Sequence, residues 1–249
     1  MSKNLKAIVL AAGRGERMRP LTDHTPKPLL PVAGKPLIVW HLEALARDGV
    51  EEVVINTAWL EEQIPATLGD GSRWGLKLHY SMEGRDHGGA LETAGGIAKA
   101  LPWLGDCFWV ISGDIYAPDF RFDAQVAQHF AASERLAHLW LVPNPPFHPR
   151  GDFGIGAGGL GMADGSGLDG KRWTYSNLAL LRAELCAGIE PGARAQLGPL
   201  LYEGMRQRRI GVEAYPGRWE NVGTPAQLEA LNAAAGEGSR PPPEPKEAP

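Results

Sequence analysis

The chain has 249 residues, a mass of 26.8 kDa and 43% hydrophobic residues, as expected for a globular protein of one domain. Its net charge of −4 excludes a general attraction to nucleic acid or to an anionic membrane. Cys107 and Cys186 make no disulfide framework, and no histidine pairs with them at zinc-site spacing. Because neither a signal peptide nor a membrane span is recognisable, we expect a cytoplasmic protein that binds neither nucleic-acid polymers nor membranes.

Strand-like and helix-like segments alternate along the chain. This order predicts an α/β fold with a Rossmann-like, mixed and mostly parallel sheet covered by helices on both faces. Strands are predicted at 6–10, 52–56, 77–81, 107–112, 137–142, 172–181 and 211–215. Helices are predicted at 36–47, 60–68, 92–101 and 122–132, with Gly49 ending the first.

Two segments depart from this alternation. Residues 151–170 are rich in glycine and predict a hairpin or a bulged excursion. Residues 236–249 hold five prolines and almost no apolar side chain. We therefore predict one domain over residues 1–235 and a disordered tail after it.

A basic, glycine-rich segment follows the first predicted strand. From Leu10 to Pro31 the chain reads LAAGRGERMRPLTDHTPKPLLP. Its glycines allow backbone N–H groups to approach an anion, and its arginines and lysine can stabilise a phosphoryl transition state. Met18 stands where a dinucleotide-binding G-x-G-x-x-G would need its third glycine. The alternative is a solvated basic turn stiffened by prolines, but the combined pattern favours a phosphate-binding loop.

The pattern G-x-G-x-R-x-x-P-L-T followed by P-K-P resembles the sugar-nucleotide pyrophosphorylases. These nucleotidyltransferases join a nucleoside triphosphate to a sugar 1-phosphate, and the resemblance implies their nucleotide-diphospho-sugar transferase type of fold. It also implies that Arg17 and Lys27 are the catalytic cations. The residues implied to bind the nucleotide in this loop are Ala11, Ala12, Gly13, Gly15 and Lys27.

Two further motifs bear on a metal site. Asp114 ends a strongly apolar strand, at the sheet edge where ligands bind, although a strand-ending aspartate can also cap a turn. In the resembled family an x-G-D at this point supplies a metal ligand. Residues 219–224 resemble W-x-D-V-G-T with Asn221 in place of the aspartate, and an amide oxygen can coordinate Mg²⁺. The resemblance implies a Mg²⁺ cofactor held by Asp114 and Asn221, the alternative being Asp114 alone.

The segment 80–97 reads YSMEGRDHGGALETAGGI and opens a predicted helix between glycines. Such a backbone suits close contact with a planar base, although it could also be a flexible loop. In the resembled family the L-x-T-x-G segment lies against the nucleobase. The resemblance therefore implies that Thr93 and Gly95 bind the nucleotide and that Glu83 reads the pyrimidine edge.

Within the family, LETAGGI and HPRGDF resemble most closely the short uridylyltransferases of cell-wall recycling that act on N-acetylmuramate 1-phosphate. UTP and a sugar 1-phosphate are then the expected substrates. This sugar carries a lactyl ether with a carboxylate, for which Arg150 is the predicted cation and Arg172 the second choice. The residues predicted to bind the sugar phosphate are Ser112, Arg150, Asp152 and Asn177, the last standing where the family commonly has glycine.

Two alternatives stay open at this point. The same loop residues would suit a guanylyl- or thymidylyltransferase acting on mannose- or glucose-1-phosphate. A non-catalytic nucleotide-sugar sensor would keep the fold without turnover, and Asn221 is the one feature that favours it.

Overall fold

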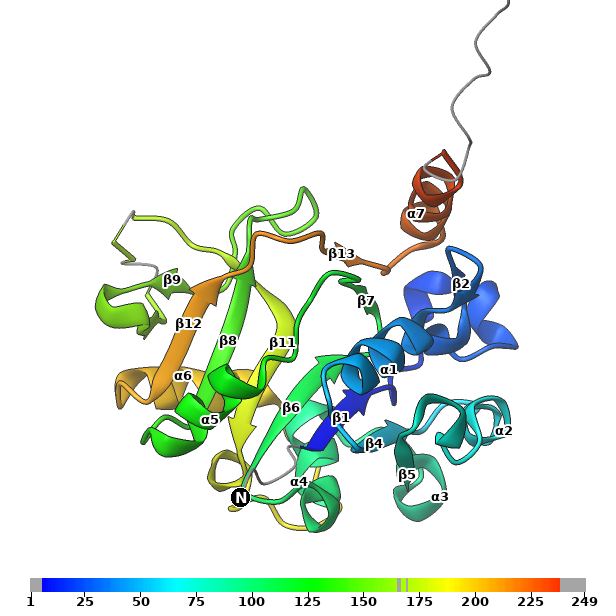
Figure 1. The fold of residues 1–249 in the computed structure, drawn as a ribbon, viewed down its shortest axis with the longest axis horizontal. Helices are drawn as coiled ribbons and strands as arrows, with labels where there is room; N and C mark the ends of the chain where they lie inside the picture. The colour runs from blue at the N-terminus through cyan, green and yellow to red at the C-terminus, as the bar shows by residue number, and fades with distance from the viewer. Residues whose placement is uncertain (1–5, 165–166, 169, 238–249) are drawn as a thin grey trace, which may run out of the picture.

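The computed structural model describes residues 6–164, 167–168 and 170–237, and a seven-stranded sheet forms its centre (Figure 1). The strand order is β12-β8-β11-β6-β1-β4-β5. Every strand of this sheet except β11 runs in the same direction. The strands are β1 (Lys6–Leu10), β4 (Glu52–Thr57), β5 (Lys77–Met82), β6 (Cys107–Ser112), β8 (Ala137–Val142), β11 (Thr174–Arg182) and β12 (Ile210–Ala214). The predicted mixed, mostly parallel sheet is confirmed, and the seven strands lie within two residues of their predicted ends.

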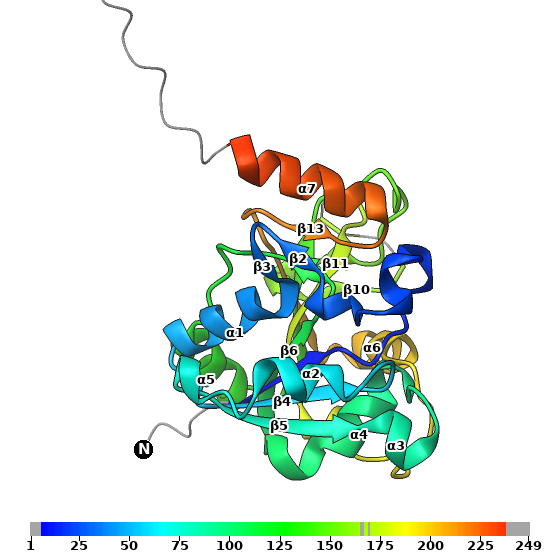
Figure 2. The ribbon, with the colours of Figure 1, turned by 90° about the vertical axis from the view of Figure 1, so that its right-hand side faces the viewer.

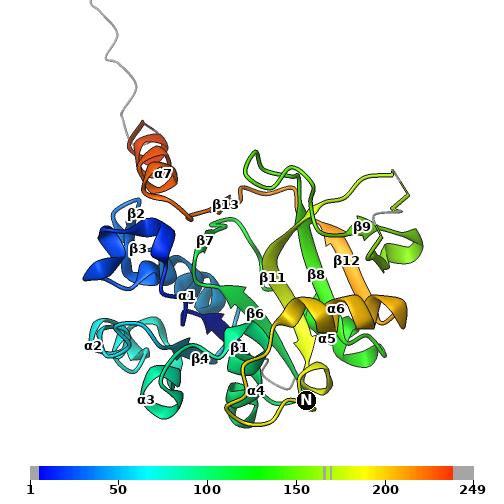
Figure 3. The same ribbon diagram turned by 180° about the vertical axis from the view of Figure 1, so that it is seen from behind.

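Helices cover both faces of this sheet. Figure 2 shows α1 and α5 on one side, and Figure 3 shows α4 and α6 on the other. The helices are α1 (Leu37–Arg47), α2 (Gln63–Leu68), α3 (Glu83–His87), α4 (Glu92–Leu104), α5 (Ala124–Ala132), α6 (Leu197–Arg206) and α7 (Pro225–Glu237). Gly49 follows α1 with a φ of +85°, so the predicted stop is confirmed.

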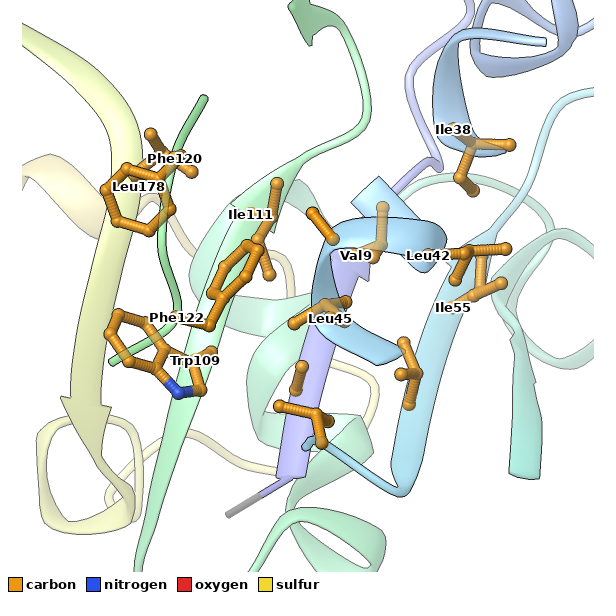
Figure 4. Close-up of a cluster of buried hydrophobic side chains, with 14 of the residues drawn as sticks. Val9, Ile38, Leu42, Leu45, Ile55, Trp109, Ile111, Phe120, Phe122 and Leu178 are labelled. Carbon is orange, nitrogen blue, oxygen red and sulfur yellow. The ribbon is translucent and has the colours of Figure 1, made fainter. Parts of the chain in front are cut away.

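The core lies in two layers because each strand alternates its side chains between the two faces. In β1, Val9 faces the α1 side and Ile8 faces the α4 side, and both are fully buried. Figure 4 shows Leu42 and Leu45 of α1 over Val9 of β1, with aromatic side chains filling the layer towards β11. Burial on both faces explains why these strands read as continuous apolar runs in the sequence.

Some helices differ from the predictions. Helix α4 continues to Leu104, beyond Pro102, because Leu104 is buried in the core and the proline costs the last turn only one hydrogen bond. Helices α3, α6 and α7 were not predicted. In α6 the apolar spacing of Leu197, Leu201 and Met205 is helical, but two glycines and a proline interrupt it.

Short elements complete the structure. The predicted hairpin is confirmed as β9 (Gly154–Ile155) paired with β10 (Gly161–Met162). Two further pairs are β2 (Pro31–Val32) with β3 (Lys35–Pro36), and β7 (Ile115–Tyr116) with β13 (Glu220–Asn221). The 3-10 turns are Glu16–Met18, Leu21–Asp23, Lys27–Leu29, Ser72–Trp74, Ala157–Gly159 and Ala183–Leu185.

The predicted tail begins in the last turn of α7, and its remainder, residues 238–249, lies outside the described residues. Its disorder and the domain boundary stay predictions. In the part of the chain that the structure describes, no helix combines the length and the apolar character that crossing a membrane requires.

Candidate active site

A cavity of about 1150 Å³ opens where β1 and β6 end and where β11 begins. This is the carboxyl edge of the parallel strands, the usual ligand site of such sheets. The lining includes most of the residues that the sequence singled out for binding. They are Ala11, Ala12, Gly13, Gly15, Arg17, Lys27, Thr93, Ser112, Asp114, Asp152, Asn177 and Asn221. Ala11 and Asn221, which stand 210 positions apart in the chain, therefore border the same cavity.

The phosphate-binding loop predicted from the sequence forms one wall of the cavity. Nothing lies within 4 Å of the position that a Cβ on Gly13 would take, so its backbone is open to a ligand. Gly15 has a φ of +68°, and its carbonyl accepts hydrogen bonds from the Thr22 hydroxyl (2.9 Å) and the Met18 backbone N–H (2.9 Å). Met18 is fully buried and anchors the loop. The loop is thus fixed in shape before a ligand arrives.

Lys27 and Asp114 form an ion pair at the centre of the site. The Lys27 ammonium donates to the Asp114 carboxylate over 2.7 Å, and the Ser112 hydroxyl donates to its other oxygen over 2.8 Å. Lys27 is 8% exposed. Burial by itself raises the pKa of Asp114, but the Lys27 charge, the hydrogen bonds from Lys27 and Ser112 and the Arg17 charge together lower it below its ordinary value. Asp114 therefore stays an anion surrounded by cations.

The β7–β13 pair brings Asn221 to the same place. Asn221 is paired with Ile115, and the Val222 backbone N–H donates to the Asp114 carbonyl over 2.9 Å. Glu220 is exposed and does not line the cavity, as expected from the alternation of side chains along a strand. A Cβ on Gly223 would lie 2.7 Å from Asn221 Oδ1 and 3.4 Å from Arg17 Nη2. Because Gly223 has no side chain, it leaves a space that the Asn221 amide oxygen and the Arg17 guanidinium both border.

These donors fit a magnesium ion that is shared with phosphates. Within the described residues there is no group of three or more histidine, cysteine, aspartate or glutamate side chains that could hold a metal. Asp114 and Asn221 supply one carboxylate and one amide oxygen, which are too few ligands to enclose a metal ion with protein atoms alone. They suit Mg²⁺, which commonly takes one or two carboxylates together with substrate phosphates and water.

The sequence prediction for Glu83 needs correction. Glu83 is fully buried, and the structure does not include it in the cavity lining. Its carboxylate accepts hydrogen bonds from Asn56 Nδ2 (2.7 Å) and from the Leu91 backbone N–H (2.8 Å). Asn56 lines the cavity and accepts from the Ala11 backbone N–H over 2.8 Å. Glu83 therefore supports the start of the phosphate loop through Asn56, and contact with a base is not available to it in this arrangement.

Gly95 is also placed outside the lining, one helical turn into α4. Its backbone N–H donates to the Ala195 carbonyl, and a Cβ there would lie 2.3 Å from the Ala193 carbonyl. This glycine allows the segment before α6 to pack against α4, and so brings Arg194 to the cavity. The predicted nucleotide contact of Thr93, which does line the cavity, stays a prediction.

The structure places some of the predicted sugar-binding residues in the cavity wall and others outside it. Asp152 and Asn177 line the cavity, whereas Arg150 is exposed and the lining does not include it. Arg172, the second choice, donates to the Ala163 carbonyl and also lies outside the lining. Asn177 has a φ of +63° at a bulge in β11, a conformation that glycine and asparagine tolerate best. This explains why glycine suits this position.

Several lining residues were missed from the sequence. Asn56 is the last residue but one of β4, a buried parallel strand, and a polar side chain at that point was a usable signal. Arg194 lies in an irregular segment and pairs with Glu92 at 3.2 Å. His148 is in the HPRGDF motif but was given no role. His148 also lines the cavity.

Comparisons with known proteins agree with this geometry. A model of the nucleotidyl transferase family matches residues 6–155. Over 93% of its length the chain is 49% identical to an N-acetylmuramate alpha-1-phosphate uridylyltransferase of Neisseria meningitidis serogroup B, covering 99% of that protein. A protein of the same name from Caulobacter vibrioides is 31% identical over 93% of the chain and 97% of its own length.

The fold has a counterpart among solved structures. A crystal structure described as that of a Bacillus anthracis glucose-1-phosphate thymidylyltransferase superimposes with a TM-score of 0.76, covering 93% of this chain and 95% of the other. The two sequences are 21% identical, so this likeness concerns the fold.

Proposed function

This chain belongs to the nucleotidyl transferase family, and from this premise we propose that it transfers the uridylyl group of UTP to N-acetylmuramate 1-phosphate. The products are UDP-N-acetylmuramate and pyrophosphate. The observation that carries the reaction type is the meeting of Arg17 and Lys27 with Asp114 and Asn221 in one cavity. The observation that carries the acceptor is the 49% identity to a full-length relative of that name. A place in the recycling of peptidoglycan, in the cytoplasm where UTP is made, follows from these substrates.

The reaction is an in-line displacement. A phosphate oxygen of the sugar 1-phosphate attacks the α-phosphorus of UTP, a new P–O bond forms, and pyrophosphate leaves. The attacking phosphate is already an anion, so the protein supplies no nucleophile and no general base. Positioning and electrostatic stabilisation are then the main contributions of the protein.

Each wall of the cavity has its own part in this reaction. The backbone around Gly13 holds the triphosphate, and Arg17 and Lys27 neutralise charge that moves onto the pyrophosphate and the attacking oxygen. Lys27 is held by Asp114 over 2.7 Å, so its ammonium is already in place and needs little reorganisation during the reaction. Arg194, which lines the cavity from the segment before α6, adds a cation for the acceptor phosphate.

Mg²⁺ would be held by Asp114 and Asn221, and when bound it supplies charge neutralisation and orientation of the phosphate chain. The Ser112 hydroxyl fixes one Asp114 oxygen over 2.8 Å, so its role in this proposal is to orient the carboxylate. Asn221 contributes an amide oxygen without a charge, which makes Asp114 the stronger ligand.

The test is a pyrophosphate-release assay with each of the four nucleoside triphosphates and with several sugar 1-phosphates. UTP with N-acetylmuramate 1-phosphate should give the highest kcat/KM. A preference for GTP or dTTP with a hexose 1-phosphate would assign the chain to another activity of the family. Binding of UTP without any turnover would identify a nucleotide-sugar sensor.

A further inference from the structure

A histidine and a carboxylate form a hydrogen-bonded pair in the cavity wall that the 143–153 segment and β11 provide. His148 Nε2 lies 3.0 Å from Asp152 Oδ1. The second oxygen, Asp152 Oδ2, accepts a hydrogen bond of 2.8 Å from the Tyr175 backbone N–H. All three residues line the cavity. Strand β6 separates β11 of this wall from β1, which is followed by the phosphate loop.

The proposed reaction does not use this pair. Its nucleophile is a phosphate anion, so a histidine–carboxylate pair is not needed as a base. The catalytic cations come from the loop after β1. A titratable pair in the same cavity, but on the wall away from that loop, is therefore available to recognise the acceptor sugar.

We propose that His148, held in place by Asp152, recognises the carboxylate of the acceptor's lactyl ether. This inference rests on the proposed function, since it names the residue that selects the acceptor. Asp152 occupies Nε2, and in the described part of the chain the other ring nitrogen, Nδ1, has no hydrogen-bond partner. In the imidazolium form Nδ1 is a donor and attracts a carboxylate. In the neutral form with its proton on Nε2, Nδ1 is an acceptor and repels one.

A carboxylate and a phenol are the titratable groups beside His148 on this wall. Asp152 is the anion in direct contact with it and is itself fixed by the backbone of β11. Burial raises the pKa of Tyr175, the titratable group that β11 places beside the pair, so its phenol stays neutral. Arg150 lies outside the cavity lining, and Arg194 is paired with Glu92 on the α4 side. Among the described residues that line this wall, His148 is the group that can form a cation, and Asp152 is its positioning residue.

The measured quantity is the ratio of kcat/KM for N-acetylmuramate 1-phosphate to kcat/KM for N-acetylglucosamine 1-phosphate, with saturating UTP and Mg²⁺. The second sugar lacks the lactyl carboxylate. His148→Gln removes the positive charge and keeps a polar side chain, so this ratio should fall by about 10-fold or more. Arg150→Ala, two residues away and outside the cavity lining, is the matched control and should leave the ratio unchanged.

A pH profile separates this role from a structural one. The wild-type ratio should fall as pH rises, because only the imidazolium form donates from Nδ1 to a carboxylate. Titration of the substrate phosphates cancels because both acceptors and UTP carry the same phosphates. Asp152→Asn removes the carboxylate that holds the His148 ring in place, and so should lower the ratio. His148→Gln should abolish the pH dependence of the ratio.

An unchanged ratio in His148→Gln, with a wild-type preference for N-acetylmuramate 1-phosphate, would overturn this inference and leave the proposed function intact. So would a loss of preference in Arg194→Ala combined with none in His148→Gln. Equal use of the two sugars by the wild type would instead contradict the proposed acceptor, and with it the need for a carboxylate-binding residue.

Discussion

At the scale of single residues, the site depends on charges that are buried and fixed before substrates bind. Lys27 and Asp114 satisfy each other in a wall of the cavity, and each would be costly to bury alone. The arrangement is therefore sensitive to the loss of either partner. Three predictions follow from individual side chains.

Lys27→Met should lower kcat by roughly 10²-fold or more, because a fixed cation is removed from developing charge. Lys27→Arg keeps the charge and is the matched control, with a smaller loss. Circular dichroism and thermal unfolding should accompany the assay, since Asp114 loses its partner. A folded Lys27→Met enzyme with a rate near that of the wild type would make this lysine structural.

Activity should require a divalent cation and should be abolished in Asp114→Ala. Asn221→Asp should remain active, because a carboxylate is a better Mg²⁺ ligand than an amide. Titrating Mg²⁺ in the assay measures this directly, and Asn221→Asp should need less Mg²⁺ than the wild type. An inactive Asn221→Asp protein beside an unaffected Asn221→Ala protein would place the metal elsewhere.

His41 should make stability depend on pH. Burial lowers the pKa of His41 from 6.5 to about 4, although its hydrogen bond to the Ile115 carbonyl and the Asp114 charge raise it. As pH falls below about 6.5, the unfolded chain takes up this proton before the folded one. The free energy of unfolding should therefore decrease between pH 6.5 and 4, by roughly 3 kcal/mol in total. Above pH 7 the His41 side chain is neutral in both the folded and the unfolded chain, so it adds no pH dependence there.

The measurement is urea unfolding at pH 7 and pH 5 in the wild type and in His41→Gln, which can still donate to the Ile115 carbonyl. The variant should lose roughly 2 kcal/mol less than the wild type between these two pH values. Equal losses in both proteins would show that His41 does not carry the dependence.

At the scale of elements, the phosphate loop is held by the segment after β4. The Arg14 guanidinium lies 3.8 Å from the centre of the Trp59 ring, and Trp59 Nε1 donates to the Thr22 carbonyl over 2.8 Å. Thr22 in turn holds Gly15. Trp59 thus links the phosphate loop to the segment that follows β4. It also positions Arg14, which lines the cavity.

Trp59→Ala should raise KM for UTP on the order of 10-fold, since a cation–π contact and a hydrogen bond are lost together. Trp59→Phe keeps an aromatic ring beside Arg14 and should have a smaller effect. The matched control is Trp74→Ala, because Arg73 lies over Trp74 at the same 3.8 Å and neither residue lines the cavity. An equal KM for UTP in Trp59→Ala and in the wild type would contradict this role of the element.

At the scale of the whole molecule, α7 joins the end of the chain to its beginning. Leu228 and Leu231 pack in one buried cluster with Met18 of the phosphate loop, Tyr116 of β7 and Val222, which follows β13. Asn232 accepts from the Ala33 backbone N–H over 2.8 Å. The helix therefore covers both the phosphate loop and the strand that carries Asn221, as Figure 2 shows for its position beside β13.

Leu231→Ala should destabilise the protein by about 2–4 kcal/mol, the usual cost of truncating a buried leucine. Deleting residues 238–249 should change neither Tm nor kcat, because that composition buries little apolar surface. Differential scanning calorimetry of both proteins gives the comparison. A lower Tm in the truncated protein would mean that the tail packs on the domain.

Much of the fold and part of the site follow from the sequence by itself, because their signals are local. A run such as Ala7–Val9 buried on both faces must be apolar throughout, so the strands could be recognised one by one. The phosphate loop is contiguous, so its glycines and cations appear together in the chain. Asp114 was recognisable because a carboxylate directly ends a buried strand.

Tertiary structure alone decided what faces the cavity from distant segments. Arg150 and His148 stand two residues apart, yet His148 lines the cavity and Arg150 does not. Glu83 occupies the position that the resemblance suggested, but its carboxylate is taken by Asn56 and Leu91. Arg194 reaches the site only because Gly95 lets two backbones approach. Sequence patterns determine the conformation and burial of residues that are neighbours along the chain. The direction of a side chain in a loop depends instead on hydrogen bonds between segments that are far apart in the sequence.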